Sequence, residues 1–408
     1  MSLAIEGTPS ASWRDTGCDF VAVAEKMAPL VEAQADDAEQ LRHQTQDVVA
    51  ALRSAGLYRL LLPRALGGEE LNFINAMKAI ERLAHADGSA GWCAMVANVA
   101  ASSVGAYLPE RGAEQVFGSG PDVLIAGQGV PRGEARPVEG GYMVRGEWSY
   151  GSGIYFADLI HCGCFVMDGD RPQIDSDGVP VSMLVHFCPN EITIKDNWNT
   201  LGLRGTGSFD YSLKSDAIFV PEHMCYLYAA DKPLRGGSQY GVGLIGFTTW
   251  GHSSWALGIG RRILDEIATI ARAKKGPFGL LGASASFKQA YAGAEAKYRA
   301  ARAFCYECWS ELDLAALGDD ERAGLNHIAL VRMAMRHLHD VVSEIATFAH
   351  RAGGGATLRS SILQRCYRDV HSGTQHILLS DEILQECGRV LLNLTGKDAR
   401  WGIFGILE

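Results

Sequence analysis

The segment GGYMVRGEWSYGSG at residues 140–153 combines an indole ring, small hydroxyl side chains and closely spaced glycines. Its pattern predicts a strand hairpin that turns at Gly146 and ends at the glycines around Ser152, where missing side chains let a flat ligand approach the backbone. We interpret this hairpin as one wall of a flavin site. A surface hairpin with a glycine turn is the alternative.

Two histidines near the end of the chain are candidates for acid–base chemistry. His371 and His376 lie in RDVHSGTQH at 368–376, and an unperturbed histidine pKa of about 6.5 suits a base that works near neutral pH. The pattern predicts one long helix over 359–387. Five residues rotate a helix by roughly 140°, so the two rings should not share a face. We expect only one of them to reach a binding site.

The elements that must position these residues change along the chain. Residues 1–118 favour helices, residues 119–232 hold short β-rich runs separated by turn residues, and residues 233–408 favour long amphipathic helices. The predicted helices are Asp47–Ser54, Asn75–Ala86, Ala90–Tyr107, Ser254–Lys275, Ala283–Leu314, Arg322–Arg351 and Arg359–Cys387. This order predicts an α+β fold with an N-terminal helical domain, a central β-barrel or sandwich domain and a C-terminal four-helix bundle.

Composition excludes several classes of partner. The chain has 408 residues, 47% of them hydrophobic, and a formal net charge of −10, which argues against nucleic acid or an anionic membrane as the main partner. No apolar run reaches the roughly 18 residues of a membrane span, and the N-terminus lacks the pattern of a signal peptide, so we expect a cytoplasmic protein. The ten cysteines read as reduced thiols, and Cys305 and Cys308 lack the partners of a metal site.

Several sequence motifs resemble the acyl-CoA dehydrogenase fold. They are LRSAGLYRLLLPRALGG at 52–68, ADGSAGW at 86–92, the segment at 140–153, LGLRGTGS at 201–208 followed by FVPE at 219–222, and RDVHSGTQH at 368–376. Dehydrogenases of this fold abstract a proton with a glutamate, and its two known positions fall here on Ser360 and near Thr248. No Asp or Glu occurs between Ile345 and Arg368 or between Asp231 and Asp265, so the dehydrogenase base is missing.

The motifs GVPRGEARPVEGGYMVRGEWSYGSG, WNTLGLRGTGS and RDVHSGTQH instead resemble the flavin-dependent monooxygenases of this fold, such as 4-hydroxyphenylacetate hydroxylases and dibenzothiophene monooxygenases. The resemblance implies the oxygenase component of a two-component system. It would take reduced flavin from a separate reductase and, with dioxygen and through a C4a-hydroperoxyflavin, hydroxylate an aromatic or heteroaromatic small molecule. It also implies a homotetramer. The stretch 271–282 departs from the dehydrogenases' diphosphate-binding motif, which favours reduced FMN, with FAD as the alternative.

The same resemblance assigns the cofactor-binding residues. Ser152 matches the hydroxyl that contacts flavin N5 and is a candidate catalytic residue, with Ser149 as the weaker alternative. Trp148 and Trp198 offer flat surfaces for the flavin ring or for closing the pocket, and core packing alone would also explain either residue. Arg204 is expected either to neutralise a phosphate or to brace its loop.

The substrate side is less fully assigned. His376 matches the catalytic position of the monooxygenase motif, and His371 is a second substrate-side candidate that packing or an interface would also explain. Trp92 and Asn98 are expected in the pocket, and Asn98 stands where related hydroxylases carry a histidine, so the oxidised atom can be carbon, nitrogen or sulfur. Three alternatives stay open: a dehydrogenase or nitroalkane-oxidase-like enzyme with a displaced base, an N-oxygenase of an amino sugar, and a non-enzymatic flavin-binding protein.

Overall fold

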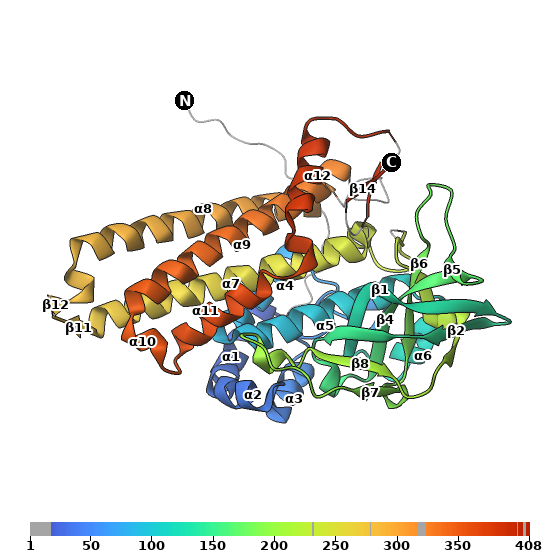
Figure 1. Cartoon of the computed structure of the whole chain (residues 1–408), viewed down its shortest axis with the longest axis horizontal. Helices are drawn as coiled ribbons and strands as arrows, with labels where there is room; N and C mark the ends of the chain where they lie inside the picture. Colours follow the sequence, from blue (N-terminus) through green and yellow to red (C-terminus); the bar gives the residue numbers. More distant parts are fainter. Residues whose placement is uncertain (1–17, 231, 278, 316–323, 398, 403–404) are drawn as a thin grey trace.

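Helices, then strands, then helices follow one another along the chain in the computed structural model (Figure 1). The structure describes residues 18–230, 232–277, 279–315, 324–397, 399–402 and 405–408. This order confirms the predicted α+β fold class. The three predicted domain ranges stay a prediction, because one continuous hydrophobic core draws on all of them.

The first part of the chain forms helices around a buried central one. These helices are α1 (Phe20–Ala33), α2 (Ala35–Leu41), α3 (Gln46–Ser54), α4 (Phe73–Ala86), α5 (Gly88–Tyr107) and α6 (Glu110–Phe117). Asp87 caps α5, since its carboxylate accepts the N–H of Ala90 at 2.8 Å. The side chains of α5 are small or apolar on every face of the helix, and nearly all of its residues are buried. The segment 57–68 connects α3 to α4 and contains only a short 3-10 turn at Arg64–Leu66.

Two β sheets form the middle of the structure. The larger contains β1 (Ile125–Val138), β2 (Gly141–Arg145), β4 (Leu159–Asp168), β5 (Arg171–Pro172), β6 (Ser182–Phe187), β9 (Ile218–Pro221) and β10 (Cys225–Leu227). Its order is β10-β6-β4-β1-β2-β9, with β5 beside β4 and a parallel pair at β1 and β4. The smaller sheet has the order β3-β8-β7, formed by β3 (Glu147–Gly151), β8 (Phe209–Leu213) and β7 (Ile192–Ile194).

The predicted hairpin at 140–153 is wrong in its pairing. β2 pairs with β1 and β9, whereas β3 pairs with β8 in the other sheet. The chain passes between the sheets at Gly146, where a Cβ would lie 2.8 Å from the Cα of Gly133. A close crossing of two glycines, rather than a tight hairpin turn, therefore explains the glycine at this position.

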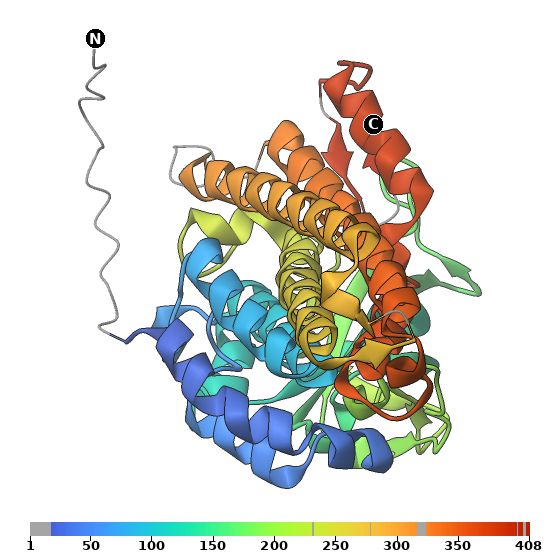
Figure 2. The same ribbon diagram turned by 90° about the vertical axis from the view of Figure 1, so that its left-hand side faces the viewer.

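The C-terminal part forms a helical bundle, which Figure 2 shows from its end. Its helices are α7 (Gly243–Ala273), α8 (Ala285–Ala315), α9 (Leu325–Gly353), α10 (Gly355–Leu358), α11 (Ile362–Gly373) and α12 (Asp381–Leu391). Two short strand pairs join β11 (Lys275–Gly276) to β12 (Gly279–Leu280) and β13 (Arg400–Trp401) to β14 (Ile406–Leu407). The predicted start of the third long helix at 322 lies outside the described residues.

The prediction of one helix over 359–387 is wrong. α11 ends at Gly373, which packs against the ring of Trp255 so tightly that a Cβ would lie 2.5 Å from it. His376 then caps a short 3-10 helix, η8 (Ile377–Leu379), and α12 follows. The chain between α11 and α12 is therefore an irregular segment that can turn inward.

Helix α7 holds the bundle against the N-terminal helices. It packs on α4, α5 and α9, and it approaches α4 so closely at Gly258 that a Cβ there would lie 2.2 Å from the carbonyl oxygen of Glu81. This close approach fixes α4 and α7 beside each other. No helix among the described residues is long and apolar enough to cross a membrane.

A buried carboxyl group connects the bundle to the loop 198–208. Asp369 on α11 accepts the N–H of Leu203 at 2.5 Å. The pKa of Asp369 is raised to about 7. Burial is the larger cause, and the neighbouring carboxylate of Asp87 is the second. In the unfolded chain an aspartate titrates near 4, so between about pH 4 and pH 7 the folded protein retains a proton that the unfolded chain has lost.

Replacing Asp369 should therefore change how stability depends on pH. Relative to Asp369→Asn, the wild-type free energy of unfolding should fall as pH rises from 4 to 7, by up to about 1.4 kcal/mol per pH unit. Chemical denaturation of both proteins across this range measures the difference. Parallel stability curves would show that Asp369 is ionised in the folded protein throughout.

Candidate active site

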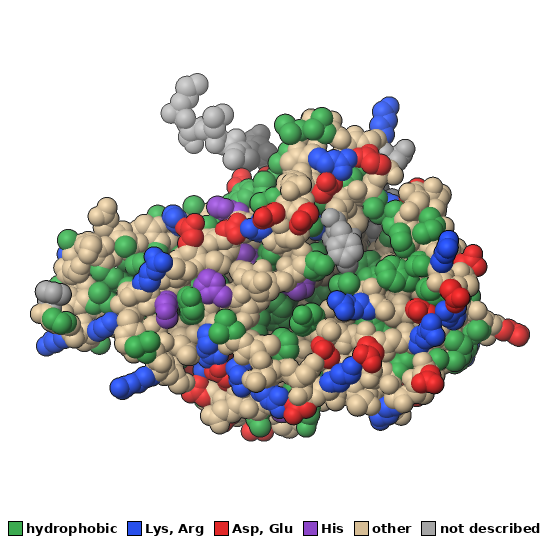
Figure 3. Space-filling model, in the orientation of Figure 1, with side chains coloured by type: hydrophobic (Ala, Val, Ile, Leu, Met, Phe, Trp, Pro, Cys, Tyr) green, Lys and Arg blue, Asp and Glu red, His purple; other side chains and the backbone are tan. Residues whose placement is uncertain are grey.

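A cavity of about 490 Å³ lies where the N-terminal helices, the β sheets and the bundle meet. Its walls come from α5, β1, β4, the end of β3, the loop 198–208, the start of α7 and the segment 372–378. Figure 3 shows hydrophobic side chains gathered in a hollow on the face where the bundle meets the sheets. A volume of this size is typical of small-molecule and cofactor sites.

An ordered chain of hydroxyl groups reaches the cavity at Ser152. The hydroxyl of Thr206 donates to the carbonyl oxygen of Leu203 at 2.7 Å, and because a carbonyl can only accept, the direction of this bond is fixed. Ser208 must then donate to Thr206 at 2.7 Å. The hydroxyl of Ser152 must in turn donate to Ser208 at 2.6 Å.

Trp92 completes this chain from the other side. Its indole N–H donates to the Ser152 oxygen at 3.1 Å. Ser152 has therefore used its only proton and received one hydrogen bond, so its remaining capacity is that of an acceptor. A ligand that approaches Ser152 from the cavity must bring a donor.

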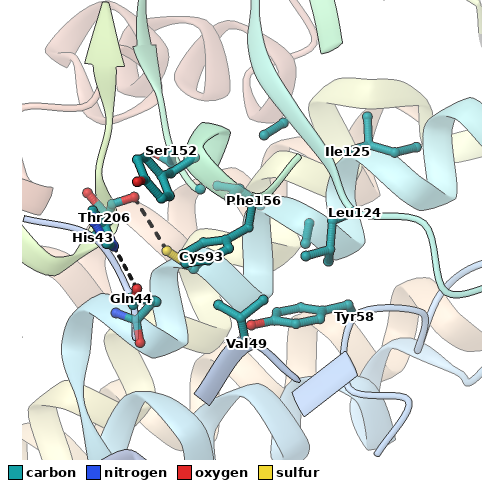
Figure 4. Close-up of a pocket in the computed structure, with 15 residues that line it drawn as sticks. His43, Gln44, Val49, Tyr58, Cys93, Leu124, Ile125, Ser152, Phe156 and Thr206 are labelled. Carbon is teal, nitrogen blue, oxygen red and sulfur yellow. Dashed lines mark hydrogen bonds between the residues drawn. The ribbon is translucent and has the colours of Figure 1, made fainter. Parts of the chain in front are cut away.

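A second space behind Ser152 has a volume of only about 30 Å³ (Figure 4). Figure 4 shows Ser152, Thr206 and Cys93 around it, with the Cys93 thiol donating to the Thr206 carbonyl oxygen at 3.6 Å. Such a volume holds about one water molecule. The main cavity is therefore the side from which an organic ligand can reach Ser152.

Three histidines gather at one end of the cavity: His252 and His339 are buried, and His376 is half-buried. The rings of His376 and His252 lie 4.1 Å apart between centroids, and His339 lies 5.9 Å from His252. Burial lowers the pKa of His376 and of His339 to about 4, and it holds the pKa of His252 well below its usual range. All three rings are therefore neutral at pH 7.

The neutral form of His376 has a defined tautomer. As the cap of η8, its Nδ1 accepts the N–H of Leu378 at 3.3 Å. Nδ1 is therefore unprotonated, and the ring proton lies on Nε2. In this state His376 offers a hydrogen-bond donor through Nε2, which differs from the resident base suggested by the sequence.

Four of the expected site residues border the cavity: Trp92, Ser152, Trp198 and His376. Trp92 lies edge-on to His252, with 5.0 Å between ring centroids, and so joins the hydroxyl chain to the histidine cluster. The indole N–H of Trp198 donates to the Leu203 carbonyl oxygen at 3.1 Å, which holds its ring in the loop 198–208.

Two expected residues lie in the core instead. Trp148 donates to the carbonyl oxygen of Gly163 at 2.8 Å and stacks on Tyr211. The register of β3 shifts between Trp148 and Gly151, and Tyr150 takes a φ of 63°. This bulge turns Trp148 into the core while Tyr150 borders the cavity. The amide of Asn98 is fully buried and donates to the carbonyl oxygens of Leu57 and Ala94 at 2.8 and 2.9 Å.

The remaining three candidates are also outside the cavity lining. Ser149 belongs to β3 but does not border the cavity. Arg204 donates to Asn199 at 3.1 Å and to the Thr200 carbonyl oxygen at 3.4 Å, so it braces its own loop. His371 packs edge-on against Tyr367 on α11, with 4.5 Å between ring centroids.

Residues that the sequence analysis did not propose as flavin or substrate contacts complete the lining. His252, Thr248 and Leu244 follow one another at intervals of four along α7 and all face the cavity. This spacing is the signal that would have identified His252. Ser208, the last residue of the LGLRGTGS motif, and His161, which no quoted motif contains, also line the cavity.

No Asp or Glu occurs among the described residues that border the cavity. Thr248, one of the positions where the dehydrogenase glutamate was sought, does border it, and its hydroxyl donates to the Leu244 carbonyl oxygen at 2.8 Å. Ser360, the other position, is exposed and lies outside the lining. The cavity therefore offers no carboxylate to remove a proton from a carbon atom.

Comparison with known proteins places the chain in a family. Residues 13–114 match the acyl-CoA dehydrogenase N-terminal domain, and residues 250–381 match the acyl-CoA dehydrogenase C-terminal domain. The chain is 32% identical to indole-3-acetate monooxygenase from Pseudomonas putida, over 87% of this chain and 89% of that protein. It is 27% identical to the flavin-dependent monooxygenase oxygenase subunit HsaA of Rhodococcus jostii, over 86% of this chain and 92% of that protein.

The chain belongs to the flavin-dependent monooxygenases of the acyl-CoA dehydrogenase fold. A solved structure supports the fold assignment. The crystal structure of 3-HSA hydroxylase from Rhodococcus sp. RHA1 superposes with a TM-score of 0.84 at 23% identity, over 94% of this chain and 99% of that one. The sequence-based prediction of the family is confirmed.

The cavity of this monooxygenase fits a flavin. It has mostly apolar walls, the flat ring of Trp198, and an unused acceptor at Ser152. Lys274, in the stretch that the resemblance aligns with the diphosphate-binding motif of the dehydrogenases, does not border this cavity and donates to the Gly353 carbonyl oxygen at the end of α9, at 2.6 Å. The ammonium group of Lys274, which could otherwise neutralise a diphosphate, is therefore already hydrogen-bonded within the protein.

The histidine cluster makes a spectroscopic prediction. Because the pKa of His376 is lowered to about 4, its ring should stay neutral, with the proton on Nε2, from pH 8 to pH 6. Histidine-selective 15N spectra, assigned with a His376→Asn variant, would report both the tautomer and the titration. Since the unfolded chain takes up these protons near pH 6.5, stability should also fall as the pH drops below that value. A His376 resonance that titrates between pH 6 and 7 would contradict this.

Proposed function

We propose that this monooxygenase inserts one atom of dioxygen into an aromatic or heteroaromatic small molecule held in the 490 Å³ cavity. It would use reduced flavin, supplied by a separate reductase, and act as the oxygenase component. The observation that carries the proposal is the arrangement of this cavity, which joins an acceptor at Ser152 to neutral histidines without any lining carboxylate. The similarity to indole-3-acetate monooxygenase supports a bicyclic aromatic substrate.

Ser152 would hold the flavin at N5. The N5 atom of reduced flavin carries a hydrogen, whereas that of oxidised flavin does not. The acceptor left on Ser152 by Trp92 and Ser208 therefore matches the reduced form. When bound, the reduced flavin supplies the electrons that activate dioxygen.

His376 would act on the oxygen side of the reaction. Its Nε2–H can donate to an oxygen atom of the substrate or of the group being transferred, and such a bond is stronger in a site that excludes water. Trp92 and Trp198 exclude water and pack against flat rings. Tyr150, held at a positive φ and edge-on to Trp198, forms part of the same wall.

Reduced FMN is the proposed flavin, with FAD as the alternative, because Lys274 is occupied at the end of α9. A homotetramer and a location in the cytoplasm are further proposals, which rest on the resemblance of the sequence to two-component hydroxylases.

The Ser152 role predicts a redox-dependent binding effect. Ser152→Ala should weaken binding of reduced flavin by about five-fold, since a neutral hydrogen bond contributes about 1 kcal/mol. Binding of oxidised flavin should change less, and more hydrogen peroxide should be released per flavin oxidised. Anaerobic titration and peroxide assays measure these effects. Ser149→Ala is the matched control, and equal losses for both flavin states would contradict the assigned hydrogen-bond direction.

The His376 role predicts a separation of binding from chemistry. Protein given reduced flavin, air and indole-3-acetate or indole should form a product heavier by one oxygen atom, measured by mass spectrometry. His376→Ala should bind flavin normally but form this product about 10- to 100-fold more slowly. His376→Asn retains a cap for η8, so it separates loss of the donor from loss of local structure. Loss of flavin binding in both variants would refute the role.

A further inference from the structure

A pair of histidines, His161 and His186, lies at the end of the cavity opposite the cluster of His252, His339 and His376. His161 on β4 borders the cavity, and His186 lies directly opposite it on β6, behind the cavity wall. Their exposed fractions are 5% and 1%. Neither histidine has a part in the function proposed above.

The backbone fixes the direction of the hydrogen bonds through this pair. Nδ1 of His186 lies 2.9 Å from the carbonyl oxygen of Met224, which can only accept, so His186 carries its proton on Nδ1. Burial lowers the pKa of His186 to about 4, so the ring is neutral and its Nε2 has a lone pair. This Nε2 lies 3.1 Å from Nδ1 of His161. His161 must therefore donate from Nδ1.

The consequence is an unprotonated nitrogen at the cavity wall. Burial also holds the pKa of His161 well below its usual range, so a proton on Nδ1 leaves Nε2 as a pure acceptor. A Cβ on Gly129, which lines the cavity, would lie 3.5 Å from this Nε2 and 3.5 Å from Leu244. Among the described residues, none donates a hydrogen bond to it.

The two ends of the cavity thus have opposite hydrogen-bonding character. Leu244, near His161, and His252, beside His376, stand eight residues apart on α7, or about 12 Å at 1.5 Å per residue. The donor of His376 marks one end and the acceptor of His161 the other. A flat molecule of one or two rings can lie between them.

We propose that Nε2 of His161 accepts a hydrogen bond from a ring N–H or phenolic O–H of the substrate and thereby selects aromatic molecules that carry such a donor. The inference rests on the proposed function and specifies its substrate class. His186 acts as a positioning residue, because its bond to Met224 keeps the proton of His161 on the side away from the cavity.

Indole and benzothiophene provide the test, because they have similar shapes but only indole carries an N–H donor. Their affinities would be measured by anaerobic equilibrium dialysis against the protein with reduced flavin bound. The preference for indole should fall about five-fold or more in His161→Leu, the effect of one neutral hydrogen bond. His186→Leu should lower it partly, and His186→Gln, which keeps an acceptor, should restore it. The exposed His337→Leu, outside the cavity lining, is the control and should leave the preference unchanged.

The unaltered protein gives a second measurement that does not depend on the folding of a variant. It should bind 1-methylindole at least about five-fold more weakly than indole, since methylation removes the donor. An unchanged preference in His161→Leu, equal binding of the two indoles, or failure to bind either bicyclic probe would overturn the proposal. So would a loss of flavin affinity in His161→Leu with the preference intact, because the acceptor would then serve the cofactor.

Failure of the proposed function is distinguishable from these outcomes. If the binding preference depends on His161 but neither probe gains an oxygen atom, the acceptor site is supported and the monooxygenase proposal for these substrates is refuted. If both probes gain an oxygen atom and the His161 variant has no effect, the monooxygenase proposal is supported and the acceptor site is refuted.

Discussion

The hydrogen bond from the Leu203 N–H to Asp369 determines how the two halves of the site meet. The carbonyl oxygen of the same Leu203 receives Trp198 and Thr206, and Thr206 sets the direction of the hydroxyl chain that ends at Ser152. The helix that carries Asp369 also leads into the segment that presents His376. A close approach at Gly202, where a Cβ would lie 2.2 Å from the Arg368 carbonyl oxygen, keeps loop and helix together. This hydrogen bond and the close approach at Gly202 therefore hold the hydroxyl chain at Ser152 and the segment of His376 in fixed positions relative to each other.

The second constraint is the absence of an acid from the described lining of the cavity. The histidines that line it have pKa values that burial lowers, and Arg132, the charged residue among its described lining residues, is exposed. The polar groups at these positions therefore act through hydrogen bonds of fixed direction: Ser152 and His161 accept, and His376 donates. Each direction is fixed by a backbone group that has only one possible role. Such a site can hold a flat, uncharged ring system without the cost of burying an unpaired ion.

Periodicity and turn residues, which are local, predicted the order of helices and strands, whereas the resemblance of several motifs to a known family predicted the family and pointed to Ser152 and His376, which border the cavity. The sequence could not predict the bulge at Tyr150, which sends Trp148 into the core, since strand register depends on pairing with β8. Nor did it predict that Asn98 would hold the connection at Leu57, or that contact with Trp255 would end α11 at Gly373. These outcomes depend on partners far away in the chain.

Oxygen-isotope labelling tests the central claim most directly. The protein would be given reduced flavin, indole-3-acetate or indole, and 18O2 in unlabelled water, and the organic product would be analysed by mass spectrometry. The structure predicts one 18O atom per product molecule, with the yield depending on reduced flavin. A product whose new oxygen comes from water, or a dehydrogenated product formed together with a full equivalent of hydrogen peroxide, would contradict it.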